Sequence, residues 1–128
     1  MGEPSELDRT GRLLEAVMGG HADRTESFAE VKAALEAGRM EVVVELPWYP
    51  DGGTHQIVLT QLEGERIRCF NPMGHKGRSV GEILMDGPLR RRVENDGAES
   101  FLVADLEERF AAGKAAALLF ERRHEDQR

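Results

Sequence analysis

The apolar residues in the first third of the chain recur every three or four positions, which is roughly the period of an α-helix. The first such stripe predicts a helix over residues 6–18, in which Gly11 is expected to weaken the first turn. The second stripe begins at Phe28, after a serine suited to cap a helix, and ends at Gly38, a residue type favoured just after helix C-termini. The chain is therefore expected to open with two amphipathic helices.

Beyond the second helix the pattern changes to runs rich in β-branched residues, which are typical of strands. The first run covers residues 40–46 and ends at Pro47, because proline has no N–H to donate to a sheet. Two further runs, residues 55–62 and 66–71, flank the turn Glu63-Gly64-Glu65 and predict an antiparallel hairpin. The first of them carries adjacent apolar residues at its centre, which indicates a central strand buried on both faces.

The last third of the chain mixes loop and regular patterns. Residues 72–97 are rich in glycine and charge, and the short apolar piece within them, residues 80–85, is compatible with a helical turn or a strand. Residues 101–113 predict a helix with Leu102 on its apolar face, and residues 114–122 predict a final strand. Helices followed by mostly antiparallel strands and one late helix predict an α+β domain.

The composition supports a single folded domain. The chain has 128 residues, of which 40% are hydrophobic and 32% charged, as in ordinary soluble globular proteins. We find no internal repeat and no low-complexity linker. We therefore expect one domain over residues 6–121, a disordered N-terminus over residues 1–5 and a charged tail over residues 122–128.

The charge of the chain limits its expected partners, and the distribution of its apolar residues limits its expected location. The net charge of -7 disfavours nucleic-acid binding, and acidic residues flank the two basic runs, residues 90–92 and 122–123, which we interpret as solvated faces. No apolar stretch reaches the length of a membrane span, and the acidic start excludes an ordinary secretory signal. We therefore expect a cytoplasmic protein without membrane insertion. Cys69 is the only cysteine, so no internal disulfide can form.

His55 and Asn71 stand at the outer ends of the two predicted hairpin strands. A papain-type site needs a thiolate nucleophile, a histidine base and an Asn or Asp that orients the imidazole. Because side chains alternate across a sheet, a three-residue turn at Glu63-Gly64-Glu65 places His55, Cys69 and Asn71 on one face. A two-residue turn would instead separate His55 from Asn71. The pattern alone is also compatible with a His55 that is partly exposed and has no role in chemistry.

Three segments of the chain resemble the papain-like cysteine peptidases that process double-glycine leader peptides. They read "ALEAGRMEVVV", "THQIVLT" and "FNPMG", and the later "SFLVADLEERFAAGKAAALLF" is similar to the closing helix and strand of that family. The resemblance covers roughly two-thirds of the chain. It implies a single papain-like domain with N-terminal helices packed on a half-barrel antiparallel sheet, in which His55 matches the catalytic base and Asn71 its orienting partner.

The sequence departs from the family at the nucleophile. The family's cysteine lies in a Cys-Gly pair that opens the first helix, whereas here no cysteine precedes Cys69 and the nearest counterpart is Thr10-Gly11. A threonine hydroxyl is far less acidic than a thiol, so a His-Asn pair activates it weakly. Related domains on haemolysin-type secretion transporters lack the cysteine and bind the exported protein. The resemblance therefore implies a non-catalytic domain without cofactor that binds a protein or peptide partner, as an adaptor, regulator or inhibitor, with His55 and Asn71 as relics.

Two other functions remain open from the sequence. In the first, Cys69 acts as nucleophile of a thiol peptidase or acyl-transfer enzyme with His55 and Asn71, although no helix N-terminus is expected to lower the pKa of a mid-strand thiol. The second is a metal site, whose spacings match no zinc pattern. Its candidate ligands are Cys69, His55, His75 and either His21 or Asp51.

Aromatic residues next to His55 are candidate binding residues. Trp48 and Tyr49 stand in a proline-bounded loop, where they form either an exposed recognition lip or a lid on the core, and the lid is slightly favoured. Met73, after Asn71 and Pro72, is a third candidate contact, or a plug at the end of the sheet.

Overall fold

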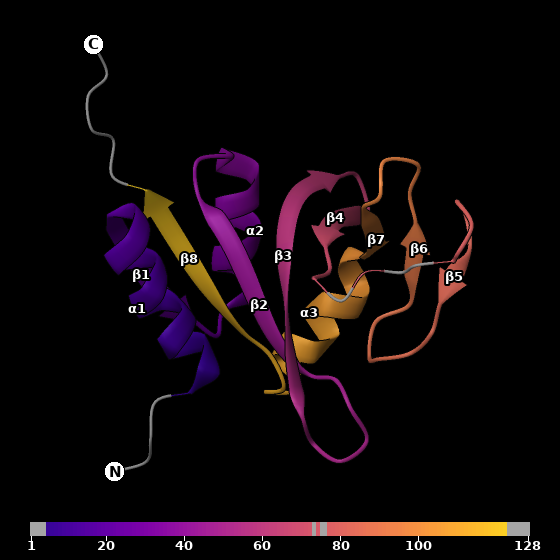
Figure 1. The fold of residues 1–128 in the computed structure, drawn as a ribbon, viewed down its shortest axis with the longest axis horizontal. Coiled ribbons are helices and arrows are strands. Elements are labelled where there is room, and N and C mark those ends of the chain that lie inside the picture. Colours follow the sequence, from indigo (N-terminus) through magenta and orange to yellow (C-terminus); the bar gives the residue numbers. More distant parts are fainter. Residues whose placement is uncertain (1–4, 73, 75–76, 123–128) are drawn as a thin grey trace.

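Eight antiparallel strands in one sheet and three helices make up the part of the chain that the structure describes, residues 5–72, 74 and 77–122 of a computed structural model (Figure 1). The predicted α+β class is therefore confirmed. In chain order the elements are α1 (Glu6–Met18), β1 (Gly20–Thr25), α2 (Phe28–Ala37), β2 (Glu41–Pro47), β3 (Thr54–Glu63), β4 (Arg66–Phe70), β5 (Ile83–Leu84), β6 (Arg91–Val93), β7 (Glu99–Leu102), α3 (Val103–Ala111) and β8 (Ala116–Arg122).

The strands follow the order β1-β8-β2-β3-β4-β7-β6-β5, and all neighbours are antiparallel. The last strand, β8, lies between β1 and β2, so the two ends of the chain meet in the sheet (Figure 1). β3 pairs with β2 on one side and β4 on the other, which confirms the predicted central strand. β3, which carries His55, and β4, which ends just before Asn71, are thus in the middle of the sheet.

The helices cover the two faces of the sheet unequally. α1 packs on one face, over β1 and β8, while α2 and α3 lie on the other face (Figure 1). Ser5 caps α1 by accepting a hydrogen bond from the Asp8 amide, in a capping box. Gly11 is buried in this helix, and a Cβ there would lie 3.0 Å from Leu118 Cδ1. The glycine therefore lets α1 approach β8 closely, at a cost in helix propensity.

The main core lies between the sheet and the helices α2 and α3. Most of its side chains are less than 3% exposed, and their burial supplies the main stabilising term of the fold. A smaller cluster, which includes Leu7 of α1, fills the opposite side. The main core consists of Val31, Ala34, Val42, Val44, Leu46, Trp48, Ile57, Leu59, Ile67, Cys69, Leu89, Phe101, Leu106, Phe110 and Ala117.

Two local features differ from the prediction, and one open alternative is decided. Strand β1 was not predicted, because its sequence "GHADRT" is mostly polar and it becomes a strand by pairing with β8. Leu102 ends β7 as the N-cap residue of α3 and is 40% exposed, so its predicted place on the apolar face of the helix is wrong. Residues 80–85 contain the two-residue strand β5, which decides between the strand and the helical turn that the sequence allowed.

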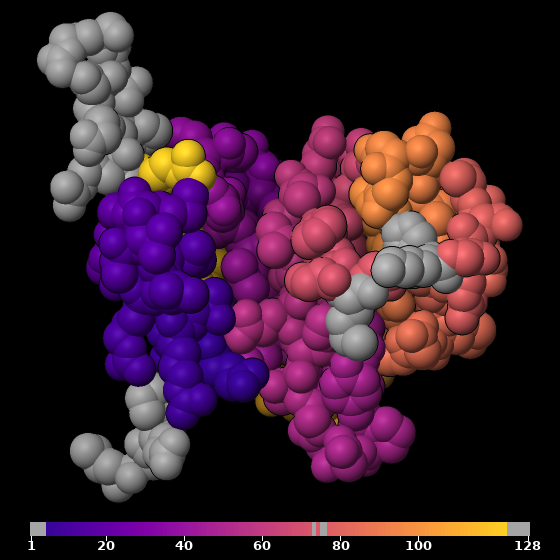
Figure 2. Space-filling model, in the orientation of Figure 1, coloured from indigo at the N-terminus to yellow at the C-terminus, as the bar shows by residue number. Residues whose placement is uncertain are grey.

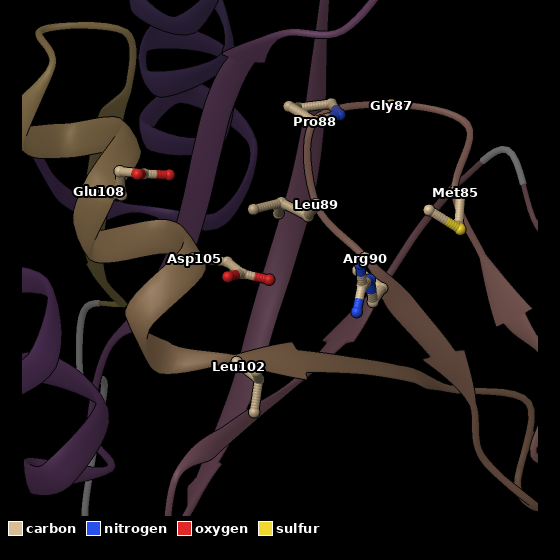
Figure 3. A pocket seen from close by; sticks show the side chains of 8 residues that line it. All are labelled: Met85, Gly87, Pro88, Leu89, Arg90, Leu102, Asp105 and Glu108. Carbon is tan, nitrogen blue, oxygen red and sulfur yellow. The ribbon is translucent and has the colours of Figure 1, made fainter.

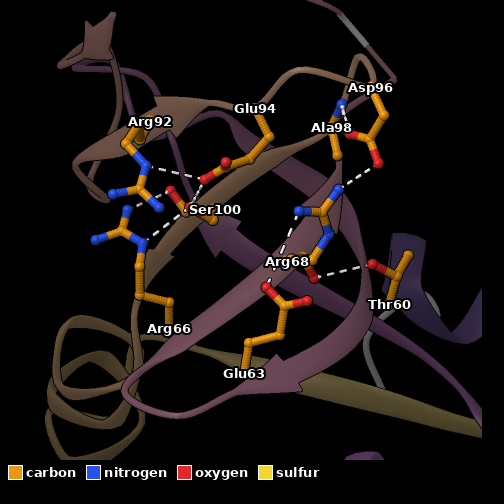
Figure 4. Close-up of polar contacts among 9 residues, drawn as sticks. All are labelled: Thr60, Glu63, Arg66, Arg68, Arg92, Glu94, Asp96, Ala98 and Ser100. Carbon is orange, nitrogen blue, oxygen red and sulfur yellow. Dashed lines mark hydrogen bonds and ion pairs between the residues drawn. The ribbon is translucent and has the colours of Figure 1, made fainter. Parts of the chain in front are cut away.

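No helix of the described part of the chain packs on the sheet face opposite α2 and α3 over β4, β7 and β6, and this face carries a polar network (Figure 4). Arg66 donates to the hydroxyl of Ser100, which donates to Glu94, and Arg92 pairs with the same carboxylate at 2.9 Å. The Ser100 hydroxyl and Arg92 lower the pKa of Glu94, against the opposing effect of its burial. Arg68 pairs with Asp96. These contacts tie the β6–β7 turn to β4.

Arg91 contradicts the prediction that residues 90–92 form a solvated face. Its side chain is 2% exposed and its Nε lies 2.7 Å from Oε1 of Glu99, which is 1% exposed. Strand alternation explains the difference, because Arg91 lies in β6 with its side chain toward the core while the neighbouring Arg92 points to the face that carries the polar network. The sheet therefore contains a buried ion pair that its sequence did not predict.

Candidate functional site

The hairpin β3–β4 places His55 and Asn71 on one face by a route that differs from the prediction. Glu63 pairs with Arg66, so the turn has two residues and the predicted three-residue turn is wrong. Thr60 is an extra residue in β3, because Leu59 pairs with Cys69 but Gln61 pairs with Arg68. This β-bulge compensates for the shorter turn. Beyond the bulge, odd-numbered residues of β3 again pair with odd-numbered residues of β4, as Leu59 does with Cys69.

His55 and Asn71 form a direct hydrogen bond. The Nε2 atom of His55 lies 2.7 Å from Oδ1 of Asn71, and Asn71 is 6% exposed. Because an amide oxygen accepts, Nε2 carries the proton, and in the neutral ring the lone pair belongs to Nδ1. The two residues that the sequence placed side by side are therefore in direct contact, and this hydrogen bond orients the His55 ring.

Trp48 packs against this pair from the core side. Its ring meets the His55 ring edge-on, with centroids 4.8 Å apart, and the Arg91 guanidinium lies 4.9 Å from the Trp48 ring centroid. Trp48 is 9% exposed and belongs to the main core, so of the two roles that the sequence allowed the structure has the lid on the core. Tyr49 is 40% exposed. Met73 lies outside the described residues.

A groove of about 450 Å³ separates α1 from the start of β3 and will be called the α1–β3 groove. In the space-filling view α1, in indigo, and β3, in magenta, form two raised parts of the surface with a hollow between them (Figure 2). Thr10 and His55, which are far apart in the sequence, both line this groove, although the His55 ring packs on Trp48 of the main core. Its lining residues are Glu6, Arg9, Thr10, Leu13, Thr54, His55, Gln56 and Pro72.

Thr10 lies in this groove, but its hydroxyl is held by other groups. Oγ1 is 2.9 Å from Oε1 of Gln56 and 3.1 Å from the carbonyl oxygen of Glu6. The helix begins at the Ser5 cap, so Thr10 is in the second turn of α1, where the dipole at the helix start has little effect on its acidity. No hydrogen bond joins Thr10 to the His55 ring within the described part of the chain.

Cys69 is at the centre of the main core, on β4. It is 0% exposed, and its pKa is raised to about 12, mainly by burial and further by Glu99, while Arg91 opposes the increase. At neutral pH the thiol is therefore protonated and inaccessible, and such a thiol is a poor nucleophile.

We expect Cys69 in the native protein to resist iodoacetamide at about pH 8, because both its burial and its raised pKa remove the reactive thiolate. The same reagent should modify the thiol completely in denaturant. Intact-protein mass spectrometry measures the added mass in both conditions. Rapid modification of the native protein at the rate of the denatured one would show that Cys69 is accessible and restore the thiol-enzyme hypothesis.

The predicted metal ligands are not brought together in the described part of the chain, which contains no group of three or more His, Cys, Asp or Glu residues placed to hold an ion. His21 is on the edge strand β1, where Nε2 lies 2.9 Å from Asp23. Asp51 accepts a hydrogen bond from the amide of Gly53 in its own loop. His75 lies outside the described residues.

Two residues of the groove were not predicted from the sequence. Gln56 holds the Thr10 hydroxyl, and its neighbour in the strand, His55, faces the other way; strand alternation from His55 was the signal that could have placed Gln56 toward α1. Leu13 was counted in the apolar stripe of the first helix but is 63% exposed at the groove. Its position in the stripe does not distinguish it from a buried residue.

None of the described helices is both long and apolar enough to cross a membrane. Comparison of the chain with family models, with curated proteins and with solved structures found no match.

Proposed function

We propose that the chain is a non-catalytic, papain-like domain that binds a protein or peptide partner in the α1–β3 groove, as an adaptor, regulator or inhibitor in the cytoplasm. The observation that carries the proposal is the 2.7 Å hydrogen bond between His55 and Asn71, together with a groove lined by Thr10, the residue at the family's nucleophile position. His55 and Asn71 remain paired, while the threonine at the nucleophile position is bound by Gln56 and lies away from the His55 ring, so the residues needed for nucleophilic catalysis are not assembled.

The lining of the groove suits a peptide chain. Leu13 and Pro72 are exposed and offer apolar contacts, while the exposed Thr54 offers a hydrogen-bonding group for a peptide backbone. Its volume of about 450 Å³ is large enough for a few side chains. The buried state of Cys69 disfavours the alternative of a thiol peptidase or acyl-transfer enzyme.

We expect Leu13→Glu to weaken partner capture at least about fivefold, because it places a charge where an apolar contact forms. The experiment is a pull-down from lysate of the native organism with the tagged protein as bait, quantified by mass spectrometry. Val17→Glu is the matched control, because Val17 is 72% exposed one turn further along α1 and outside the groove lining. Circular dichroism verifies that both variants are folded.

The outcomes separate binding from catalysis. Equal capture by Leu13→Glu and Val17→Glu would move the binding site away from the groove. Incubation of the captured partner with wild type should leave it intact by mass spectrometry. Cleavage that disappears in Thr10→Ala or Cys69→Ala would contradict the non-catalytic part of the proposal.

A further inference from the structure

A second hollow, of about 360 Å³, lies between α3 and the loop of residues 85–90 (Figure 3). It will be called the α3 hollow. It belongs to the side of the sheet covered by α2 and α3, whereas the α1–β3 groove is beside α1. The two sites are therefore separate, and nothing in the proposed function uses the α3 hollow.

The loop wall of the α3 hollow is anchored in the core. Leu89 is 1% exposed and belongs to the main core, and the buried Arg91 donates to the Asp86 carbonyl oxygen at 2.8 Å. Arg109 of α3 reaches the carbonyl oxygen of Pro88 at 3.5 Å. The wall is thus formed before any ligand arrives, which lowers the conformational cost of binding.

Two carboxylates give the α3 hollow its charge. Asp105 and Glu108 are one turn apart on α3, and both point from the helix toward the loop (Figure 3). Neither forms an ion pair within the described residues, although Asp105 is close enough to Arg66 of β4 to act on it: burial lowers the pKa of the Arg66 guanidinium, and Asp105 opposes this change. Arg90 is the only cation among the lining residues, so the described lining carries an excess of negative charge.

Apolar side chains flank these carboxylates. Met85 is 68% exposed and Leu102 is 40% exposed, although both are large hydrophobic residues, and both line the α3 hollow. Exposed apolar side chains that gather in one region mark interaction surfaces, and methionine adapts to differently shaped partners.

We propose that the α3 hollow docks a segment of a partner protein in which a basic side chain, arginine or lysine, stands next to an apolar one. The cationic group would lie between Asp105 and Glu108, and the apolar side chain would cover Met85 and Leu102. The charge of the chain favours this occupant over a second copy, because two chains of net charge -7 repel each other. The same charge opposes an anionic membrane surface.

The test uses fluorescence anisotropy with a fluorescein-labelled hexapeptide of alternating leucine and arginine, at low salt. The doubly substituted Asp105→Asn/Glu108→Gln protein should bind this probe at least about fivefold more weakly, since both substitutions keep the side-chain shape and remove the charge. Glu107→Gln is the matched control, because Glu107 is on α3 but not in the lining. It should change the affinity less than about twofold.

Substitution of Arg90 should change the affinity for the arginine probe in the opposite direction. Arg90→Gln removes the cation of the lining and should tighten binding of the arginine probe by about twofold or more, whereas a merely destabilised protein would lose affinity. A probe with glutamate in place of arginine should not bind wild type. Unchanged affinity in the double variant, or an equal loss of affinity in Glu107→Gln, would overturn the proposal. So would weaker binding in Arg90→Gln, or no binding of the arginine probe to wild type at millimolar concentration. Leu13→Glu in the α1–β3 groove should leave this binding unchanged.

Discussion

Glu99→Gln is expected to lower the free energy of unfolding by about 3 kcal/mol, because it leaves the buried charge of Arg91 without its principal partner. The two side chains are 2% and 1% exposed and lie 2.7 Å apart, so water cannot replace the lost carboxylate charge. Asp86 also contacts Arg91, at 3.2 Å, but its carboxylate is 75% exposed and compensates only in part. Urea unfolding followed by circular dichroism measures the difference in midpoint and slope.

Two variants test the reason for that loss. Glu41→Gln makes the same substitution in the exposed pair with Arg122 and should cost less than about 0.5 kcal/mol. The double variant Arg91→Met/Glu99→Leu removes both charges and should recover at least half of the loss, because an apolar pair of similar size avoids the desolvation penalty. A loss below about 1 kcal/mol in Glu99→Gln, close to that of Glu41→Gln, would show that the Arg91–Glu99 pair is hydrated.

The elements that the sequence predicted are those whose pattern is local. Both early helices, the strands β2, β3 and β4, and the final strand β8 follow from apolar periodicity with glycine or proline at their ends. β1 could not be predicted in this way, because its polar residues form a strand through pairing with β8, almost a hundred positions later in the chain. The order of the strands in the sheet, and the face on which each helix packs, likewise depend on contacts between segments that are distant in the sequence.

The sequence predicted that His55 and Asn71 share a face of the sheet, but it could not predict the turn and the bulge that place them there. A three-residue turn was needed for this arrangement in a regular hairpin, but the structure has a two-residue turn and a bulge at Thr60. Either change alone reverses the parity, and together they cancel. The bulge has no sequence signal in "IVLTQL", since Thr60 is a good strand former whose hydroxyl contacts the Arg68 carbonyl oxygen only once the strands have paired.

Burial of side chains beside the candidate site was only partly predicted from the local sequence. Arg91 stands in a basic run and Trp48 in a proline-bounded loop, and both contexts are common at the surface. Both side chains are nevertheless buried, and the Arg91 guanidinium packs over the Trp48 ring. The loop of residues 85–91 therefore has two roles. It covers the ring that packs on His55, and it forms the wall of the α3 hollow.

Gly87→Ala is expected to destabilise the protein by about 3 kcal/mol, because Gly87 is where this loop meets Trp48. A Cβ at that position would lie 2.6 to 2.9 Å from three atoms of the indole ring, and the backbone φ of 116° is rarely adopted by residues other than glycine. We expect the ring to move away from His55 and Arg91. Trp48 is the only tryptophan, so its fluorescence should shift to longer wavelength as water reaches it, and urea unfolding measures the loss of stability.

Gly97→Ala separates the two causes of this effect. Gly97, in the β6–β7 turn, has a φ of 87°, and a Cβ at this position would have no atom within 4 Å, so the substitution carries backbone strain without a clash. It should cost about 1 kcal/mol and leave the fluorescence of Trp48 unchanged. If Gly87→Ala and Gly97→Ala destabilise the protein equally and neither shifts the emission, the contact between the loop and Trp48 does not hold the ring in place. The loop would then have no influence on the His55–Asn71 pair.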